Sequence, residues 1–483
     1  MAQSIKRNAF YNVLLNIAAV IFPLITAPYV SRVLEPDGVG LYNFSFTYAG
    51  YFALVAMLGI PTYGVREVSK IRDDKKALSR LVSQLLSVAA ITTFLVSGIY
   101  ILTIALIGQL SENYVIFVIA GFVIYLAPFR VNWFYQGIEE FGIITKVTLI
   151  VRTLSVICLF IFVKEKNDLV IYVVLSVLGT VLADMWNFSS MIRSGIKPKF
   201  TFKGLKPHVG PLMILFASSI AVSIYTVLDT LMLGFLTDYD EVGYYSNALH
   251  ISRVIMTVVT SLSLVAVPRV SYYMKNKNFE NINILINKSF SIVTFLAFPI
   301  ALGLICLAPV FVPLFFGEHF MGAVIPLIIL ALLIPIIGLN NLTGTQILIG
   351  LGFDKLLLYS VLAGTISNFI LNWVLIPLYG SVGASVASVS AEILVLAATI
   401  YFVIKHTTVR VANWNDILKA VFGSLLLLPL ALMLNYIFEG WFFVIIFTLT
   451  GSLLYLTTEA VLNNSMFYLC KSIITSKIMK QNK

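Results

Sequence analysis

The chain has 483 residues, of which 59% are hydrophobic and 11% are charged, and its formal net charge is +10. A soluble domain carries about 25% charged residues, so this composition excludes an ordinary soluble enzyme. No long polar block separates the apolar segments, which excludes a separate soluble catalytic domain. The basic excess therefore indicates loops that set membrane topology rather than nucleic-acid binding. The three cysteines lack the spacing of a metal site or a disulfide framework.

The apolar segments follow one another along the chain and predict an all-α polytopic membrane protein. A helix needs about 20 apolar residues to cross a hydrocarbon core about 30 Å thick. On this criterion we expect about 14 transmembrane helices. They are placed at residues 10–34, 40–61, 81–108, 114–134, 143–163, 169–192, 210–236, 243–268, 288–316, 321–349, 357–378, 381–404, 417–438 and 441–462.

The basic residues fall almost entirely in alternate loops, which predicts the orientation of the chain. With the N-terminus inside, the outside loops contain only Lys164 and Lys166 as basic residues, and they are otherwise acidic, as at Glu35 and Asp37. Lys and Arg concentrate on the cytoplasmic side of membrane proteins. We therefore expect an even number of spans and cytoplasmic termini. About 12 spans with two re-entrant pieces is the alternative.

An internal repeat relates the two halves of the chain. The segment Leu34–Tyr42 recurs as Leu236–Tyr245, so that Gly40 corresponds to Gly243. The same number of helices separates the matches in each half, which predicts a parallel repeat of six helices with two further helices at the C-terminus. Parallel repeats of transporters form two lobes with the substrate path between them. The expected parts are an N-lobe at 1–192, a cytoplasmic linker at 193–209, a C-lobe at 210–404, and the last two helices with a basic cytoplasmic tail at 405–483.

Several short motifs resemble, by their order and spacing, a known transporter superfamily. They are Pro28–Leu34, Gly38–Tyr42, Gly64–Glu67, Leu228–Gly234 and Pro377–Ala384. The chain is similar to the multidrug/oligosaccharidyl-lipid/polysaccharide (MOP) exporters, and within them to the Wzx-type flippases of O-antigen and capsule repeat units. One departure is Glu35, because a Gly after Leu34 is common in such proteins.

The resemblance implies a fold like that of multidrug and toxin extrusion (MATE) transporters and a place in the bacterial cytoplasmic (inner) membrane. It also implies a flippase for polysaccharide biosynthesis, of lipopolysaccharide or capsule. Such a protein moves undecaprenyl-diphosphate-linked oligosaccharide from the cytoplasmic to the outer leaflet by alternating access, without ATP. The identity of the sugar does not follow from the resemblance.

Four arginines fall within the predicted spans: Arg32, Arg130, Arg152 and Arg253. A charge at the centre of a span costs about 2.5–3.5 kcal/mol on insertion scales, so it usually faces a partner or a wet cavity. Arginine binds phosphate oxygens in bidentate fashion, so these residues predict a cationic cavity for a diphosphate. The alternative for Arg32 and Arg130 is that their side chains extend to the membrane surface, and Arg32 could instead pair locally, close to Glu35 and Asp37.

Two groups of polar residues lie at matching predicted depths. Arg152 and Asp184 are expected to pair, either as a structural ion pair or with Asp184 orienting a cavity-facing Arg152. Asp229, His250 and Arg253 are expected at one level of the C-lobe. Because histidine titrates near physiological pH, this group predicts either a proton-coupling site or a packing network.

Glu392 lies in the middle of a predicted span with no basic residue at its depth in the C-lobe. Asn368 is expected beside it. An unpaired carboxyl group becomes protonated, or binds a cation together with amide oxygens. Both a neutral structural group and a site for H+ or Na+ therefore stay open.

The sequence contains no P-loop, zinc-protease or nucleophile-elbow motif, and its four histidines are scattered. We therefore expect a transporter that is not an enzyme and needs no cofactor beyond a coupling ion, either H+ or Na+, as in an antiporter. The outside loops are too short for a polysaccharide polymerase or ligase. A lipid II flippase and a MATE-type cation or drug exporter are the alternative functions. The expected partners are the lipid-linked oligosaccharide and membrane lipids, for a monomer that binds no nucleic acid. Polysaccharide polymerase and chain-length proteins are further candidate partners.

Overall fold

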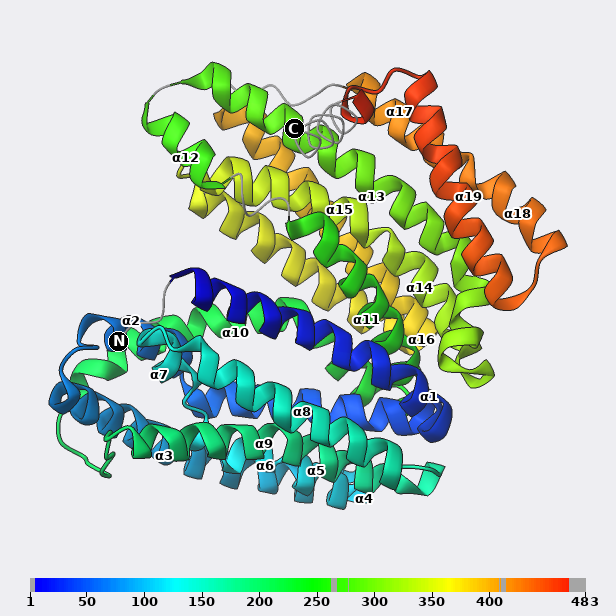
Figure 1. The fold of residues 1–483 in the computed structure, drawn as a ribbon. Coiled ribbons are helices and arrows are strands. Elements are labelled where there is room, and N and C mark those ends of the chain that lie inside the picture. The colour runs from blue at the N-terminus through cyan, green and yellow to red at the C-terminus, as the bar shows by residue number, and fades with distance from the viewer. Residues whose placement is uncertain (1–4, 262–266, 277, 408, 410–413, 469–483) are drawn as a thin grey trace, which may run out of the picture. The chain divides into compact units, whose positions relative to one another are not determined.

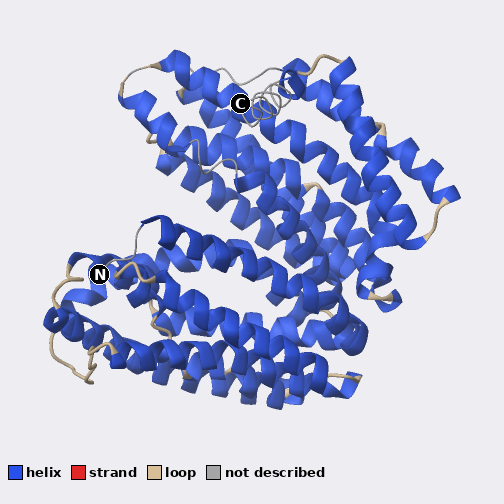
Figure 2. Cartoon of the chain, viewed as in Figure 1, coloured by secondary structure: helices blue, strands red, loops and turns tan. Residues whose placement is uncertain are grey.

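The computed structural model describes residues 5–261, 267–276, 278–407, 409 and 414–468, which are almost entirely helical and contain no strand (Figures 1 and 2). This confirms the predicted all-α membrane fold. Helices satisfy every backbone hydrogen bond within one segment, which a hydrocarbon environment requires. The basic tail predicted at the C-terminus lies outside the described residues from 469 onward.

The chain forms two compact units, residues 1–243 and 244–483. Unit 1 contains α1 (Ile5–Met57), α2 (Ile60–Lys70), α3 (Lys75–Leu106), α4 (Gly108–Glu112), α5 (Tyr114–Ala120), α6 (Phe122–Tyr125), η1 (Ala127–Phe129), α7 (Asn132–Gly137), α8 (Phe141–Phe162), η2 (Lys166–Asp168), α9 (Leu169–Arg193), α10 (Lys206–Leu236) and the start of α11 (Tyr239–Ser261). Unit 2 contains the rest of α11, then α12 (Val267–Lys275), α13 (Phe279–Phe316), η4 (Glu318–Ala323), α14 (Val324–Ala331), α15 (Leu333–Asn340), the π-helical η5 (Asn341–Ile349), α16 (Asp354–His406), α17 (Trp414–Leu425), α18 (Leu427–Ile437) and α19 (Gly440–Val461).

Within the described residues, ten helical stretches are long and apolar enough to cross a membrane. Two of them, Arg7–Lys70 and Asp354–His406, each contain two predicted spans. The predicted spans run together there because the helix continues through sharp kinks, at Glu35 in α1 and Gly380 in α16. The total of fourteen spans stays a prediction.

Helix α10 belongs to unit 1, where it packs along α1. The hydroxyl group of Tyr51 in α1 donates a hydrogen bond to the carbonyl oxygen of Ser223 in α10, at 3.0 Å. The repeat in the sequence instead assigns this helix to the second lobe, after the linker at 193–209. The division into an N-lobe at 1–192 and a C-lobe at 210–404 stays a prediction.

Two glycines that the sequence repeat makes equivalent lie against each other in unit 1. A Cβ atom at Gly40 would overlap the carbonyl oxygen of Tyr239, and one at Gly243 would overlap that of Pro36. Helices in membranes approach most closely where small residues let their backbones touch. The contact therefore joins two positions that the sequence repeat makes equivalent.

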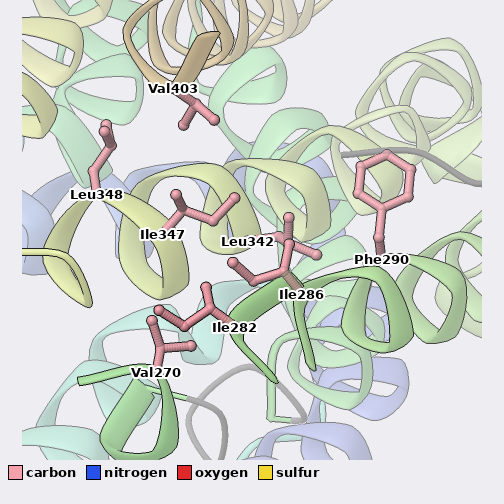
Figure 3. Close-up of a cluster of buried hydrophobic side chains, with 8 residues drawn as sticks. All are labelled: Val270, Ile282, Ile286, Phe290, Leu342, Ile347, Leu348 and Val403. Atoms are coloured by element: carbon pink, nitrogen blue, oxygen red, sulfur yellow. The ribbon is translucent and has the colours of Figure 1, made fainter. Parts of the chain in front are cut away.

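Unit 2 has an apolar core at one end of its bundle (Figure 3). The side chains in Figure 3 come from α12, α13, η5 and α16, and they point toward one another between these helices. They are Val270, Ile282, Ile286, Phe290, Leu342, Ile347, Leu348 and Val403, all of them buried. This core holds the π-helical η5 against its neighbours, and therefore fixes the end of α15 that precedes it.

The kink in α1 places Glu35 in a backbone conformation that only glycine adopts readily. Its φ is 58° and its ψ is 177°. Such a conformation costs a residue with a side chain about 1–3 kcal/mol. The side chain of Glu35 accepts a hydrogen bond from Lys166 Nζ at 2.7 Å, which ties the kink to η2. A glutamate at this position, where glycine is common, therefore introduces backbone strain but also forms an exposed ion pair.

We expect Glu35→Gly to stabilise the protein by about 1 kcal/mol. Relief of the strain outweighs the lost exposed ion pair, worth about 0–1 kcal/mol, and the greater flexibility of glycine in the unfolded chain. The midpoint of thermal unfolding in detergent measures the effect. Asp37→Gly is the matched control, because Asp37 lies two residues on and lacks a positive φ, so glycine there should lower the midpoint. A lower midpoint for Glu35→Gly would contradict the strain.

Candidate functional site

Arg130 and Asp184 form an ion pair inside unit 1. The Nε atom of Arg130 donates to Oδ2 of Asp184 at 3.1 Å, and the side chains are 30% and 10% exposed. Arg130 follows a break in the predicted fourth span, where the one-turn helix η1 contains Pro128. Proline ends the regular helix there, and η1 lies against α9, the helix that carries Asp184. The expected pairing of Asp184 with Arg152 is therefore wrong.

Arg152 is half-buried on α8, a helix that packs against both α1 and α9. Within the described residues, its side chain has neither a hydrogen-bond partner nor an ion-pair partner. An uncompensated charge in an apolar span is costly unless water or an anionic ligand reaches it. Arg152 is thus an intramembrane cation of unit 1 that is available to a ligand.

A polar network continues from the ion pair along α9. The side chain of Asn187 donates to Oδ1 of Asn132 at 3.0 Å, and the hydroxyl group of Tyr135 donates to the carbonyl oxygen of Asn187 at 2.7 Å. Asn187 is buried and lies three residues, about one helical turn, after Asp184. The sequence analysis did not single out these residues, although an asparagine one turn from an intramembrane aspartate was a usable signal.

The other predicted arginines lie elsewhere. Arg32 is exposed on α1, close before the kink at Glu35. Arg253 lies on α11 in unit 2. Their role in a common cationic cavity stays a prediction.

The predicted group of Asp229, His250 and Arg253 is divided between the two units. Asp229 is buried on α10 in unit 1, whereas His250 and Arg253 lie on α11 in unit 2. The Nε2 atom of His250 is buried and makes no hydrogen bond to the described residues. The grouping of Asp229 with these two residues stays a prediction.

Glu392 has an amide partner in unit 2, but not the one that the sequence suggested. Asn340 at the end of α15 donates through Nδ2 to Oε2 of Glu392 at 2.5 Å and to its carbonyl oxygen at 3.1 Å. Asn368 instead accepts a hydrogen bond from Asn372 on the same helix, at 3.1 Å. Sequence reasoning missed Asn340, although two successive asparagines, Asn340 and Asn341, interrupt an otherwise apolar span.

An apolar pocket of about 370 Å³ lies in unit 2 between α13 and α19. Its wall is closed at one point by Tyr455, whose hydroxyl group donates to the carbonyl oxygen of Phe295 at 2.8 Å. Gly303 and Gly451 leave space on the two facing helices. The pocket is suited to a hydrocarbon chain, because its lining offers almost no polar groups.

Comparisons with known proteins agree with this architecture. The family described as "Polysaccharide biosynthesis protein" matches residues 5–274, and the MatE family matches residues 215–374. The chain is 22% identical over 404 residues to a protein of Escherichia coli (strain K12) named as an O-antigen transporter. That alignment covers 83% of this chain and 97% of the relative.

Two solved structures share the fold. The lipid II flippase MurJ, in an inward closed conformation, has a TM-score of 0.76 at 18% identity, and the match covers 95% of this chain and 99% of MurJ. An inward-facing MATE-family multidrug transporter of the MOP superfamily has a TM-score of 0.58 at 14% identity, covering 82% and 98% of the two chains. The match to the first family spans more than half of the sequence, and the chain therefore belongs to the polysaccharide biosynthesis protein family.

Proposed function

We propose that this transporter flips undecaprenyl-diphosphate-linked oligosaccharide from the cytoplasmic to the outer leaflet by alternating access. The observation that carries the proposal is Arg152, a half-buried intramembrane cation without a partner among the residues that the structure describes. The name of the Escherichia coli relative, an O-antigen transporter, supports the same class of substrate. The proposal includes the bacterial inner membrane and cytoplasmic termini, as the distribution of Lys and Arg predicts.

The charged diphosphate is the part of such a substrate that crosses hydrocarbon least readily without the protein. Moving it through hydrocarbon requires a cation that replaces water around the phosphate oxygens. The planar guanidinium group of Arg152 binds two phosphate oxygens at once. Asp184 does not compete for Arg152, because it is already bound to Arg130. Arg32 and Arg253 are proposed as further phosphate contacts along the path.

The polyprenyl chain needs an apolar surface while its head group crosses. The pocket between α13 and α19 is a candidate for this role, since it is lined by apolar side chains and has a volume of about 370 Å³. A pocket of this kind would keep a hydrocarbon tail among apolar side chains. This arrangement suits a lipid-linked sugar better than a soluble cationic drug.

The coupling ion is proposed to be H+ or Na+. Glu392 is the better supported site, because its carboxyl group lies within a span and is bonded to an amide group of Asn340. His250 is the second candidate, as its buried Nε2 atom makes no hydrogen bond to the described residues. Lipid II is the alternative substrate, and the arginines within the spans favour either anionic lipid over the cations that drug exporters carry.

We expect Arg152→Ala to lose at least tenfold of the transport activity, because charge-assisted hydrogen bonds contribute about 1.5–3 kcal/mol. The assay is complementation of a bacterium that lacks its O-antigen flippase, scored by surface polysaccharide at equal membrane expression. Arg193→Ala is the matched control, because Arg193 is exposed at the end of α9. Wild-type surface polysaccharide with Arg152→Ala would rule out the proposed role of this residue.

We expect the ion pair to show strong coupling in a double-mutant cycle. Asp184→Ala leaves Arg130 uncompensated, and Arg130→Ala leaves Asp184 buried without its partner, so each should lower the stability by roughly 1–3 kcal/mol. The double variant should be no less stable than either single variant. Thermal unfolding of the purified protein in detergent measures all three, and strictly additive effects would argue against a structural pair.

A further inference from the structure

The segment that joins α9 to α10 is bound along α3 in an extended form. The backbone N–H groups of Lys199 and Thr201 donate to the hydroxyl oxygens of Ser83 and Ser87, each at 2.9 Å. The two serines are buried and lie one helical turn apart on α3. Alternate residues of an extended strand are spaced by a similar distance, so the two sets of groups match. This register determines which side chains of the segment face α3.

A basic pocket of about 380 Å³ lies where this segment meets α3. Its cationic side chains are Arg80, Lys199 and Lys203, and no carboxylate lines it. The amide group of Gln84 in its wall is already engaged, because Oε1 lies 3.0 Å from His208 Nε2 and Nε2 donates to the carbonyl oxygen of Lys203 at 3.5 Å. Apart from the hydroxyl groups of Ser83 and Thr201, the polar side chains left to bind a ligand are the three cations, which select an anion.

A second, mainly apolar pocket of about 210 Å³ adjoins the basic one, and the two share Ser83 and Lys199. Its apolar wall includes Leu86, Ala90, Phe129, Phe188 and Phe200. The two pockets lie next to each other along the segment, one basic and one apolar, and together they are called the bipartite cavity here. An amphiphile with an anionic head matches this division, whereas a free anion would leave the apolar part without a ligand.

The cavity lies at the level of the lipid head groups. Ser83 and Ser87 are about 12–18 Å along α3 from its first residue, Lys75. The strongly exposed apolar side chains of α3, such as Phe94, begin further along. Phe200 and Phe202 of the segment are 60% and 74% exposed, and their rings contact each other at 4.9 Å. Exposed aromatic rings beside lysines are typical of a segment that lies in the membrane interface.

We propose that this bipartite cavity binds an anionic glycerophospholipid of the leaflet on the basic side of the membrane. The phosphate group lies among Arg80, Lys199 and Lys203, and the first part of one acyl chain lies against Phe200 and the apolar wall. Clusters of basic residues next to a span attract anionic lipids in this way. The site lies within unit 1 and does not depend on the identity of the transported substrate.

Binding of dioctanoyl phosphatidylglycerol to the purified full-length protein, counted by native mass spectrometry, tests the proposal. We expect Lys199→Gln/Lys203→Gln to weaken binding about tenfold. The matched control is Lys76→Gln/Lys197→Gln, which removes the same charge from exposed residues of α3 and the segment that do not line the cavity. Arg80→Gln provides an independent variant if the double variant is unstable.

Binding should depend both on the head group of the lipid and on the basic side chains of the cavity. Dioctanoyl phosphatidylcholine should bind at least tenfold more weakly than phosphatidylglycerol, and 10-fold excess inorganic phosphate should not displace the anionic lipid. Displacement by inorganic phosphate would overturn the lipid in favour of a plain phosphate site. Equal binding to the control and cavity variants, with Arg80→Gln also unchanged, would overturn the cavity itself.

Discussion

The ion pair between Arg130 and Asp184 determines how charge is distributed within unit 1. Asp184 was the carboxylate expected beside Arg152, and its pairing with Arg130 leaves Arg152 without an ion-pair partner in the described part of the chain. Hydrocarbon does not solvate a charged group. A charge that pairs within the protein is therefore compensated and has a structural role, whereas an unpaired charge needs water or a ligand to compensate it. The functional assignment of Arg152 depends on this difference rather than on its depth alone.

The backbone of unit 1 supports this arrangement at two points. The break at Pro128 brings Arg130 toward α9, and the kink at Glu35 directs α1 to the contact between Gly40 and Gly243. Both are departures from a regular helix. Such departures are tolerated in membranes where neighbouring elements satisfy the released backbone groups. One lies beside an intramembrane charge and the other lies beside a close contact between two backbones.

The positions of the helices could be predicted from the sequence because each span needs a long apolar run. The limits of α8, α9 and α19 lie within a few residues of those expected. The partners of individual side chains could not be predicted in the same way. Depth along a helix places Arg152 and Asp184 at one level, but the direction of each side chain depends on packing. The break after Pro128 and the bond from Asn340 to Glu392 arise from such local geometry.

The account of function rests on an amphiphilic substrate with an anionic head, and reconstituted transport tests it most directly. The purified protein would be placed in liposomes with a fluorescent undecaprenyl-diphosphate oligosaccharide, and the rate at which the label becomes accessible in the opposite leaflet would be measured. The account predicts rapid flipping by the wild type, a rate at least tenfold lower for Arg152→Ala, and little inhibition by a cationic drug. Flipping at the same rate by Arg152→Ala, or transport of the drug instead of the lipid, would contradict it.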